Sequence, residues 1–191
     1  MHEGHLFIIS GPSGAGKGTL VKELLRRVPA LWVSVSATTR APRASEHEGT
    51  DYFFLTPSEF EVRVRHGEFL EHAEVHGHRY GTMRAPVERR LSRGVDVILE
   101  IDPQGAAQVR KLIDRSLLVF VKAPTTDELE RRIRYRGSET EDQLRARLKT
   151  AERELKVEGM YDFVVINDDV TRATDALVDY IRSHAVDETD A

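Results

Sequence analysis

The most informative stretch of the chain is Gly11-Pro12-Ser13-Gly14-Ala15-Gly16-Lys17-Gly18-Thr19. It follows the apolar residues Leu6-Phe7-Ile8-Ile9, which are typical of a buried strand, and it opens a helical pattern over about 17–28. A glycine-rich loop in this position presents backbone N–H groups to phosphate oxygens, and the helix N-terminus adds partial positive charge. The Lys17 ammonium would reach the β- and γ-phosphates. The stretch therefore predicts a nucleotide phosphate loop.

One residue of this loop departs from the usual pattern. Gly18 follows the lysine where a Ser or Thr is usual, and the hydroxyl comes one position later, at Thr19. A direct bond from that hydroxyl to Mg²⁺ is therefore not expected. Mg²⁺ would instead be held mainly by nucleotide phosphates and water, with no metal site made by the protein alone.

Short apolar strands alternate with helical patterns on both sides of the loop. The predicted strands are 6–9, 31–36, 95–101, 117–121 and 163–166, and the predicted helices after the first are about 103–114, 126–135 and 171–184. Continuous apolar strands separated by helices are typical of a parallel sheet that is covered on both faces. The fold class is therefore α/β.

Two segments interrupt this alternation. Residues 38–82 are polar with short aromatic pieces, and Thr56-Pro57-Ser58-Glu59 is a capping box for one helix. This predicts a small, mostly antiparallel insertion. Residues 126–157 are rich in Arg and Glu and helical, with a break at Gly137 and a second capping box over 138–141. The segment holds few large apolar residues, so we expect it to pack lightly.

Composition narrows the class of protein. The chain has 191 residues, a net charge of −4, 40% hydrophobic and 31% charged residues, and no cysteine. These values predict one globular domain, and they argue against a constitutive nucleic-acid binder, disulfides and thiolate metal sites. The apolar run at 6–9 is too short for a signal peptide or a membrane helix. We therefore expect a cytoplasmic protein with no membrane partner.

Further motifs fit one family. They are Ser34-Val35-Ser36-Ala37-Thr38-Thr39-Arg40-Ala41-Pro42-Arg43, Glu48-Gly49-Thr50-Asp51-Tyr52-Phe53, Gly67-Glu68-Phe69-Leu70-Glu71, Gly77-His78-Arg79-Tyr80-Gly81-Thr82, Glu100-Ile101-Asp102-Pro103-Gln104-Gly105 and Val165-Ile166-Asn167-Asp168-Asp169. Together with the phosphate loop they resemble guanylate kinase, from Ile8 to about Ile181.

The resemblance implies a P-loop nucleoside monophosphate kinase fold with two excursions from a parallel sheet core. We predict a single domain over 1–191. Its core would comprise about 1–35, 83–125 and 158–186, its GMP-binding segment about 36–82, and its helical lid about 126–157.

The resemblance also assigns the guanine site. Glu71 and Asp102 would be the carboxylates, and Ser36 and Thr82 would supply hydroxyls. Guanine presents N1–H and N2–H₂ as adjacent donors, which one carboxylate can accept together, and O6 as an acceptor for a hydroxyl. AMP lacks both donors that face Glu71, and a site built for hydrogen bonds rejects such an analogue by ~10⁴ or more.

The remaining site residues follow from the same resemblance. The GMP phosphate would meet Arg40, Arg43, Tyr52 and Tyr80. The transferred phosphoryl group would meet Lys17, Arg40 and the lid arginines Arg132, Arg136 and Arg147. Asn167 would lie near the adenine or ribose of ATP. Glu100 is grouped with the GMP-binding residues, and Glu100 or Asp102 would act on Mg²⁺ through water.

These assignments predict an ATP:GMP phosphotransferase of purine nucleotide metabolism, with Mg²⁺ accompanying ATP. The partners would be ATP and GMP, with dGMP and the choice between monomer and homo-oligomer left open. Two other functions remain: a non-catalytic guanylate-kinase-like binding module, and a P-loop kinase for another small phosphate acceptor.

Overall fold

The computed structural model describes residues 3–75, 77–135 and 141–186. Its centre is a five-stranded sheet in the order β2-β7-β1-β8-β9, in which every neighbouring pair is parallel. The strands are β1 (Leu6–Ser10), β2 (Trp32–Val33), β7 (Val97–Glu100), β8 (Leu117–Lys122) and β9 (Phe163–Ile166). The prediction of an α/β fold with a parallel sheet is confirmed.

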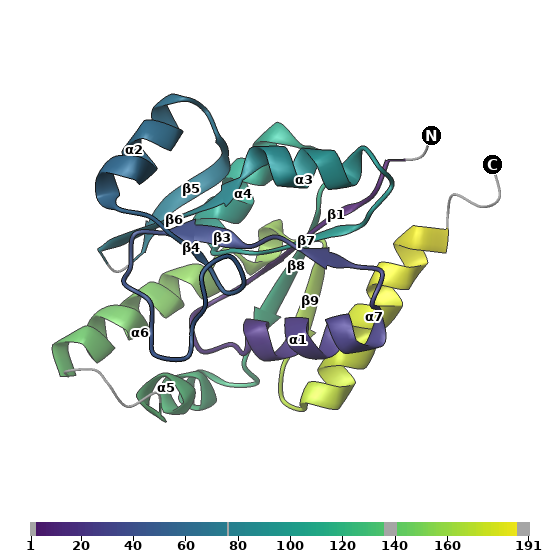
Figure 1. The fold of residues 1–191 in the computed structure, drawn as a ribbon. Helices are drawn as coiled ribbons and strands as arrows, with labels where there is room; N and C mark the ends of the chain where they lie inside the picture. Colours follow the sequence, from purple (N-terminus) through teal and green to yellow (C-terminus); the bar gives the residue numbers. More distant parts are fainter. Residues whose placement is uncertain (1–2, 76, 136–140, 187–191) are drawn as a thin grey trace.

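Helices cover both faces of this sheet (Figure 1). One face packs on α1 (Lys17–Arg27) and α7 (Val170–Val186), and the other on α3 (Arg84–Leu91) and α4 (Pro103–Leu112). The side chains of β1 alternate between the two cores: Phe7 and Ile9 join the first, whereas Leu6 and Ile8 join the second. Both faces of β1 are thus apolar, which explains why its sequence is continuously apolar rather than alternating.

The first insertion forms a second sheet in the order β4-β3-β6-β5. Its strands are β3 (Ser36–Thr38), β4 (Phe53–Phe54), β5 (Phe69–Val75) and β6 (His78–Met83), and α2 (Pro57–Arg65) packs Phe60 against it. The β3–β6 and β5–β6 pairs are antiparallel, as predicted, while β3–β4 is parallel. Thr56 caps α2 by the predicted capping box.

The predicted strand over 31–36 is wrong as a single element. Only Trp32 and Val33 pair with β7 in the parallel sheet, and Ser36 already belongs to β3 in the second sheet. All residues of 31–36 are compatible with a β-strand. Their pattern therefore does not reveal that the chain passes from one sheet to the other between Val33 and Ser36.

The second insertion contains α5 (Thr126–Tyr135) and α6 (Glu141–Leu155), followed by the short helix η1 (Glu158–Met160). These helices have a small apolar core of their own, around Leu129, Ile133 and Leu144. The segment therefore packs around a core of modest size. The predicted break at Gly137 and most of the second capping box lie outside the described residues.

Among the described residues, no helix is long and apolar enough to cross a membrane.

Candidate active site

The phosphate loop joins β1 to α1 at the carboxyl end of the parallel sheet. Gly11 and Gly16 both have positive φ, 137° and 90°, and both touch neighbours closely. A Cβ at Gly11 would stand 2.0 Å from the carbonyl oxygen of Val121, and one at Gly16 would stand 2.3 Å from the amide nitrogen of Asn167. Only glycine fits these two positions, so β8 and the segment after β9 fix the loop's path.

Lys17 begins α1 and bends back over the loop. Its Nζ donates to the carbonyl oxygens of Gly11, at 2.6 Å, and Pro12, at 3.1 Å. The ammonium is thereby held over the cleft, where a phosphate oxygen can replace a carbonyl partner.

Gly18 brings the loop close to a carboxylate. A Cβ at this position would stand 3.4 Å from Oε1 of Glu100, the last residue of β7. The place where the usual hydroxyl side chain would project therefore faces an acidic oxygen. Oxygen ligands of this kind suit Mg²⁺, which keeps several of its waters and needs few protein groups.

Three predicted guanine-site residues form one row across the second sheet. Thr82 of β6 is the register partner of Ser36 on β3 and of Glu71 on β5. Neighbouring residues on adjacent antiparallel strands have side chains within contact distance. The Thr82 hydroxyl donates to Oε1 of Glu71 at 2.7 Å.

Glu71 is buried, with 4% of its surface exposed. Its Oε2 lies 2.4 Å from where a Cβ at Gly105 would stand, so α4 covers it on that side. Burial raises the pKa of Glu71 to about 7, although the Thr82 hydrogen bond lowers it; the nearby charge of Asp102 adds to the rise. A buried carboxyl with this pKa is poised to accept strong donors from a ligand.

Asp102 reaches the same region from the start of α4. Its Oδ1 accepts from the backbone N–H of Gly105 at 2.8 Å, which makes it the helix N-cap. Gly105 thus donates its N–H to Asp102, and the place where a side chain would project from it is occupied by Glu71.

The residues predicted to contact the acceptor phosphate lie together on the insertion of residues 36–82. The guanidinium of Arg40 sits 5.5 Å from the ring centre of Tyr52, and the rings of Tyr52 and Tyr80 are 6.0 Å apart. Arg43 is far more exposed, with 66% of its side chain accessible against 15% for Arg40.

The three arginines predicted to act from the second insertion lie in different settings. Arg147 of α6 lines the cleft. Arg132 of α5 donates to the carbonyl oxygen of Asn167 at 2.9 Å and lies 3.9 Å from the Cβ position of Gly16. Three other arginines of these helices are exposed: Arg131, Arg134 and Arg145. Arg136 lies outside the described residues.

Asn167 is buried beneath the phosphate loop rather than directed at open space. Its Nδ2 donates to the carbonyl oxygen of Ala15 at 2.8 Å. The side chain therefore supports the loop, and its contact with adenine or ribose stays a prediction.

One cleft brings most of the predicted residues together. Those that line it are Gly11, Ser13, Gly14, Gly16, Lys17, Gly18, Ser36, Arg40, Arg43, Tyr52, Glu71, Tyr80, Glu100, Asp102 and Arg147. The other described members do not line it: Pro12, Ala15, Thr19, Thr82, Arg132 and Asn167. Thr82 reaches it through Glu71, whereas Thr19 is exposed.

The sequence did not indicate two polar residues, Gln108 beside β5 and Glu154 at the cleft. The Gln108 amide donates to the carbonyl oxygen of His72 at 2.8 Å and accepts from its N–H at 3.3 Å, which fastens β5 to α4. Glu154 of α6 lines the cleft, and burial raises its pKa to about 6 against the opposing charge of Lys17. Its position seven residues after Arg147, two helical turns away on the same face, was the available signal.

A phosphate loop on a parallel sheet, with a small second sheet and a pair of helices around the same cleft, defines a P-loop kinase of the nucleoside monophosphate class. The family model described as guanylate kinase matches residues 3–184. The chain belongs to the guanylate kinase family.

Individual relatives agree over nearly the whole chain. A guanylate kinase of Parasynechococcus marenigrum is 52% identical over 170 residues, which are 89% of this chain and 93% of that one. A guanylate kinase of Thermotoga maritima is 45% identical and covers 95% of this chain and 87% of its own. The crystal structure of guanylate kinase from Anaplasma phagocytophilum matches with a TM-score of 0.82 at 32% identity, over 98% of this chain and 89% of that one.

Proposed function

We propose that this protein transfers the γ-phosphoryl group of ATP to GMP, giving ADP and GDP in purine nucleotide metabolism. Membership of the guanylate kinase family supports this, and the row of Ser36, Thr82 and Glu71 carries the choice of acceptor. The single domain would work with residues 36–82 as its GMP-binding segment, 126–157 as its lid, and the rest as its core.

Guanine would bind with its N1–H and N2–H₂ donors on Glu71. The Thr82 hydroxyl already donates to Oε1 of Glu71, so it orients the carboxylate and keeps its ionised form accessible. The hydroxyl of Ser36 is then the better placed of the two to donate to O6, with Asp102 at the N2 side. This division modifies the expectation that both hydroxyls face O6.

The GMP phosphate would bind between Arg40, Arg43, Tyr52 and Tyr80, which are joined by the aromatic and cation–π contacts described above. Two guanidiniums give bidentate donors to a phosphate group, and tyrosine hydroxyls add further donors. Dianionic GMP needs no general base, because its attacking oxygen is already ionised.

ATP would bind on the opposite side of the cleft. The loop from Gly11 to Thr19 would hold its phosphates, Lys17 would exchange a carbonyl partner for a phosphate oxygen, and Asn167 would lie near its adenine or ribose. An ion of Mg²⁺ on the ATP phosphates neutralises negative charge there, and Glu100, beside Gly18, would hold its waters.

Phosphoryl transfer depends chiefly on position and charge. Lys17, Arg40, Arg132, Arg136 and Arg147 would supply the cations between the two anionic substrates. The lid brings three of them, so its movement would complete the site and exclude water.

The other two functions lack comparable support. Lys17, Gly16 and the lid arginines are all present, which a binding module without catalysis would not need. A different acceptor would not need a buried carboxylate of the kind seen at Glu71. The absence of cysteine and the net charge of −4 support work in the cytoplasm without nucleic acid as a partner.

One assay separates these functions: turnover of ATP with GMP, dGMP, AMP, CMP and UMP, with Mg²⁺ present and then chelated. We expect rapid Mg²⁺-dependent transfer to GMP, and AMP disfavoured by ~10⁴ in kcat/KM. Tight GMP binding with no transfer would identify a binding module, and faster transfer to another nucleotide would identify a different kinase.

A further inference from the structure

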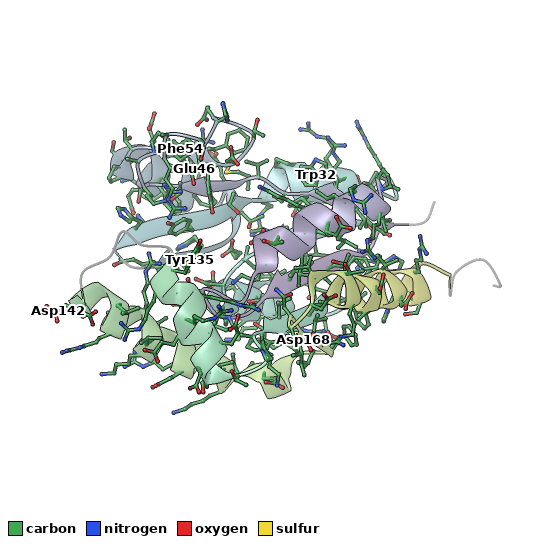
Figure 2. All side chains as sticks on the ribbon, turned by 90° about the horizontal axis from the view of Figure 1, so that it is seen from below. Trp32, Glu46, Phe54, Tyr135, Asp142 and Asp168 are labelled. Carbon is green, nitrogen blue, oxygen red and sulfur yellow. The ribbon has the colours of Figure 1, made fainter. Side chains whose placement is uncertain are left out.

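Glu46 is a carboxylate with little exposed side-chain surface, and it contacts both Arg40 and Arg43. Only 11% of its side chain is exposed. Among the described residues that line the cleft, Arg40 and Arg43 appear and Glu46 does not. Figure 2 labels Glu46 on the insertion that carries the second sheet.

Glu46 holds the Arg40 guanidinium with both of its oxygens. One nitrogen of Arg40, Nη2, donates to Oε1 at 2.8 Å and to Oε2 at 3.0 Å, while Nη1 donates to the carbonyl oxygen of Ala41 at 2.6 Å. Hydrogen bonding to Glu46, and next the phenol of Tyr80, raises the pKa of Arg40 against the effect of burial. Both Nη atoms of the Arg40 guanidinium are thus held by hydrogen bonds within the protein.

The same carboxylate closes the turn that carries Arg43. Oε2 accepts from the backbone N–H of Arg43 at 2.7 Å, and the backbone N–H of Glu46 donates to the carbonyl oxygen of Arg43 at 3.0 Å. The Arg43 guanidinium stays 3.7 Å from Oε1 and mostly exposed. One side chain therefore fixes the guanidinium of one arginine and the backbone of the other.

We propose that Glu46 is a positioning residue for the GMP phosphate: it holds Arg40 and the 43–46 turn in their binding arrangement before the substrate arrives. A free arginine side chain loses rotamer entropy when it is ordered. An arginine that is already fixed does not lose it on binding, so its phosphate contact contributes more to affinity. This inference rests on the proposed function, because it assumes that Arg40 and Arg43 bind the acceptor phosphate.

The negative charge of Glu46 weakens GMP binding, whereas its positioning of Arg40 strengthens it, so a substitution can separate the two effects. Removing a carboxylate near a phosphate site lowers repulsion and by itself would strengthen GMP binding. If positioning dominates, Glu46→Gln weakens GMP binding despite that gain.

The experiment compares wild type, Glu46→Gln and Glu61→Gln. Glu61 is the control because it pairs with Arg79 on the same segment but is about half exposed. KM is measured for GMP and ATP, and binding is measured for guanosine, which has the base but no phosphate. For Glu46→Gln we expect KM for GMP to rise roughly tenfold, the scale of one lost charged hydrogen bond. KM for ATP, guanosine affinity and every value for Glu61→Gln should change by less than about twofold.

A double-mutant cycle shows whether Glu46 acts through Arg40. In an Arg40→Ala background, Glu46→Gln should raise KM for GMP much less than in wild type, because its main partner is gone. An unchanged or lower KM for GMP in the single variant would overturn the proposal, as would an equal loss of guanosine affinity or a full effect without Arg40. Should Glu46→Gln fail to fold, Glu46→Asp, which keeps the charge but shortens the reach, is expected to show the same selective loss. Failure of the proposed function looks different, since wild type itself would then not phosphorylate GMP.

Discussion

The Thr82 hydroxyl donates to Oε1 of Glu71 at 2.7 Å, and both side chains are buried. A hydroxyl that donates to a carboxylate stabilises its ionised form, here against a burial effect that favours the neutral acid. Thr82 therefore orients the carboxyl group that is expected to recognise guanine, and it opposes part of the effect of burial on its pKa.

The first prediction concerns a substitution that removes the Thr82 hydroxyl but keeps the shape of the side chain. Thr82→Val should raise the pKa of Glu71 above its value of about 7 and lower kcat/KM for GMP roughly tenfold or more. Thr82→Ser keeps the donor and should stay close to wild type. Thr174→Val, which removes another buried threonine hydroxyl in α7, is the control for stability alone. Equal GMP kinetics in the valine and serine variants would show that the hydroxyl has no such role.

The second prediction concerns pH. The carboxyl of Glu71 has a pKa raised from 4.5 to about 7, while guanine donors favour the carboxylate, so ligand binding should release a proton. Guanosine affinity should then rise with pH up to about 7 and level off above it. Guanosine is the right probe because, unlike GMP, it has no phosphate that titrates in this range.

The raised pKa of Glu71 also makes the free energy of unfolding depend on pH: stability falls with rising pH, whereas guanosine affinity rises. The folded protein binds this proton more tightly than the unfolded chain, so the contribution of Glu71 is fully present below pH 4.5 and is lost as pH rises toward 7. Both trends should disappear in Glu71→Gln. A flat guanosine profile for wild type would mean that Glu71 does not titrate against the base.

The third prediction tests the contact between α4 and Glu71. Gly105→Ala should favour the helix by up to ~1 kcal/mol through propensity, yet its methyl would stand 2.4 Å from Oε2 of Glu71. The carboxylate must move, and a misplacement of this order can cost roughly 10²-fold in kcat/KM for GMP. Gly159→Ala, where a Cβ meets open space, is the matched control. Unchanged GMP kinetics in Gly105→Ala would contradict the packing of Glu71 on α4.

The fourth prediction concerns the phosphate loop. Lys17→Ala should reduce transfer by roughly 10²–10³ or more, because it removes a cation from the phosphates, while leaving the fold intact. Lys22→Ala, an exposed lysine on α1, should have no effect. Circular dichroism and thermal unfolding check that both variants fold. Turnover of Lys17→Ala within about tenfold of wild type would contradict the assignment of this loop.

The sequence predicts the phosphate loop and the parallel sheet well because both depend on local signals. Glycines flank a lysine at a strand–helix junction, and β1, β7 and β8 have the apolar character of strands buried on both faces. The strand predicted over 31–36 fails for the opposite reason. Which sheet accepts Val33 and which accepts Ser36 is decided by distant partners, Ile98 and Thr82.

In the candidate site, too, some residues are indicated by local motifs, whereas the contacts between distant residues are not. Family motifs single out Glu71 and Asp102, but no local pattern shows that Gly105 contacts both or that Gln108 fastens β5 to α4. The contacts between β5 and α4 join residues that are more than thirty positions apart in the sequence. Glu46 is different: its spacing of three from Arg43 and six from Arg40 was a local signal, visible once the loop's shape was known.

Recognition of guanine by Glu71 can be tested by comparing GMP with inosine monophosphate as acceptors. The inosine nucleotide lacks only the N2 amine, so kcat/KM for the two nucleotides should differ strongly in wild type. Glu71→Gln should lower kcat/KM for GMP by roughly 10- to 150-fold and bring the two values closer together, with KM for ATP little changed. Glu74→Gln, an exposed carboxylate on the same strand, should behave as wild type. If Glu71→Gln instead keeps the full wild-type ratio, Glu71 does not recognise guanine.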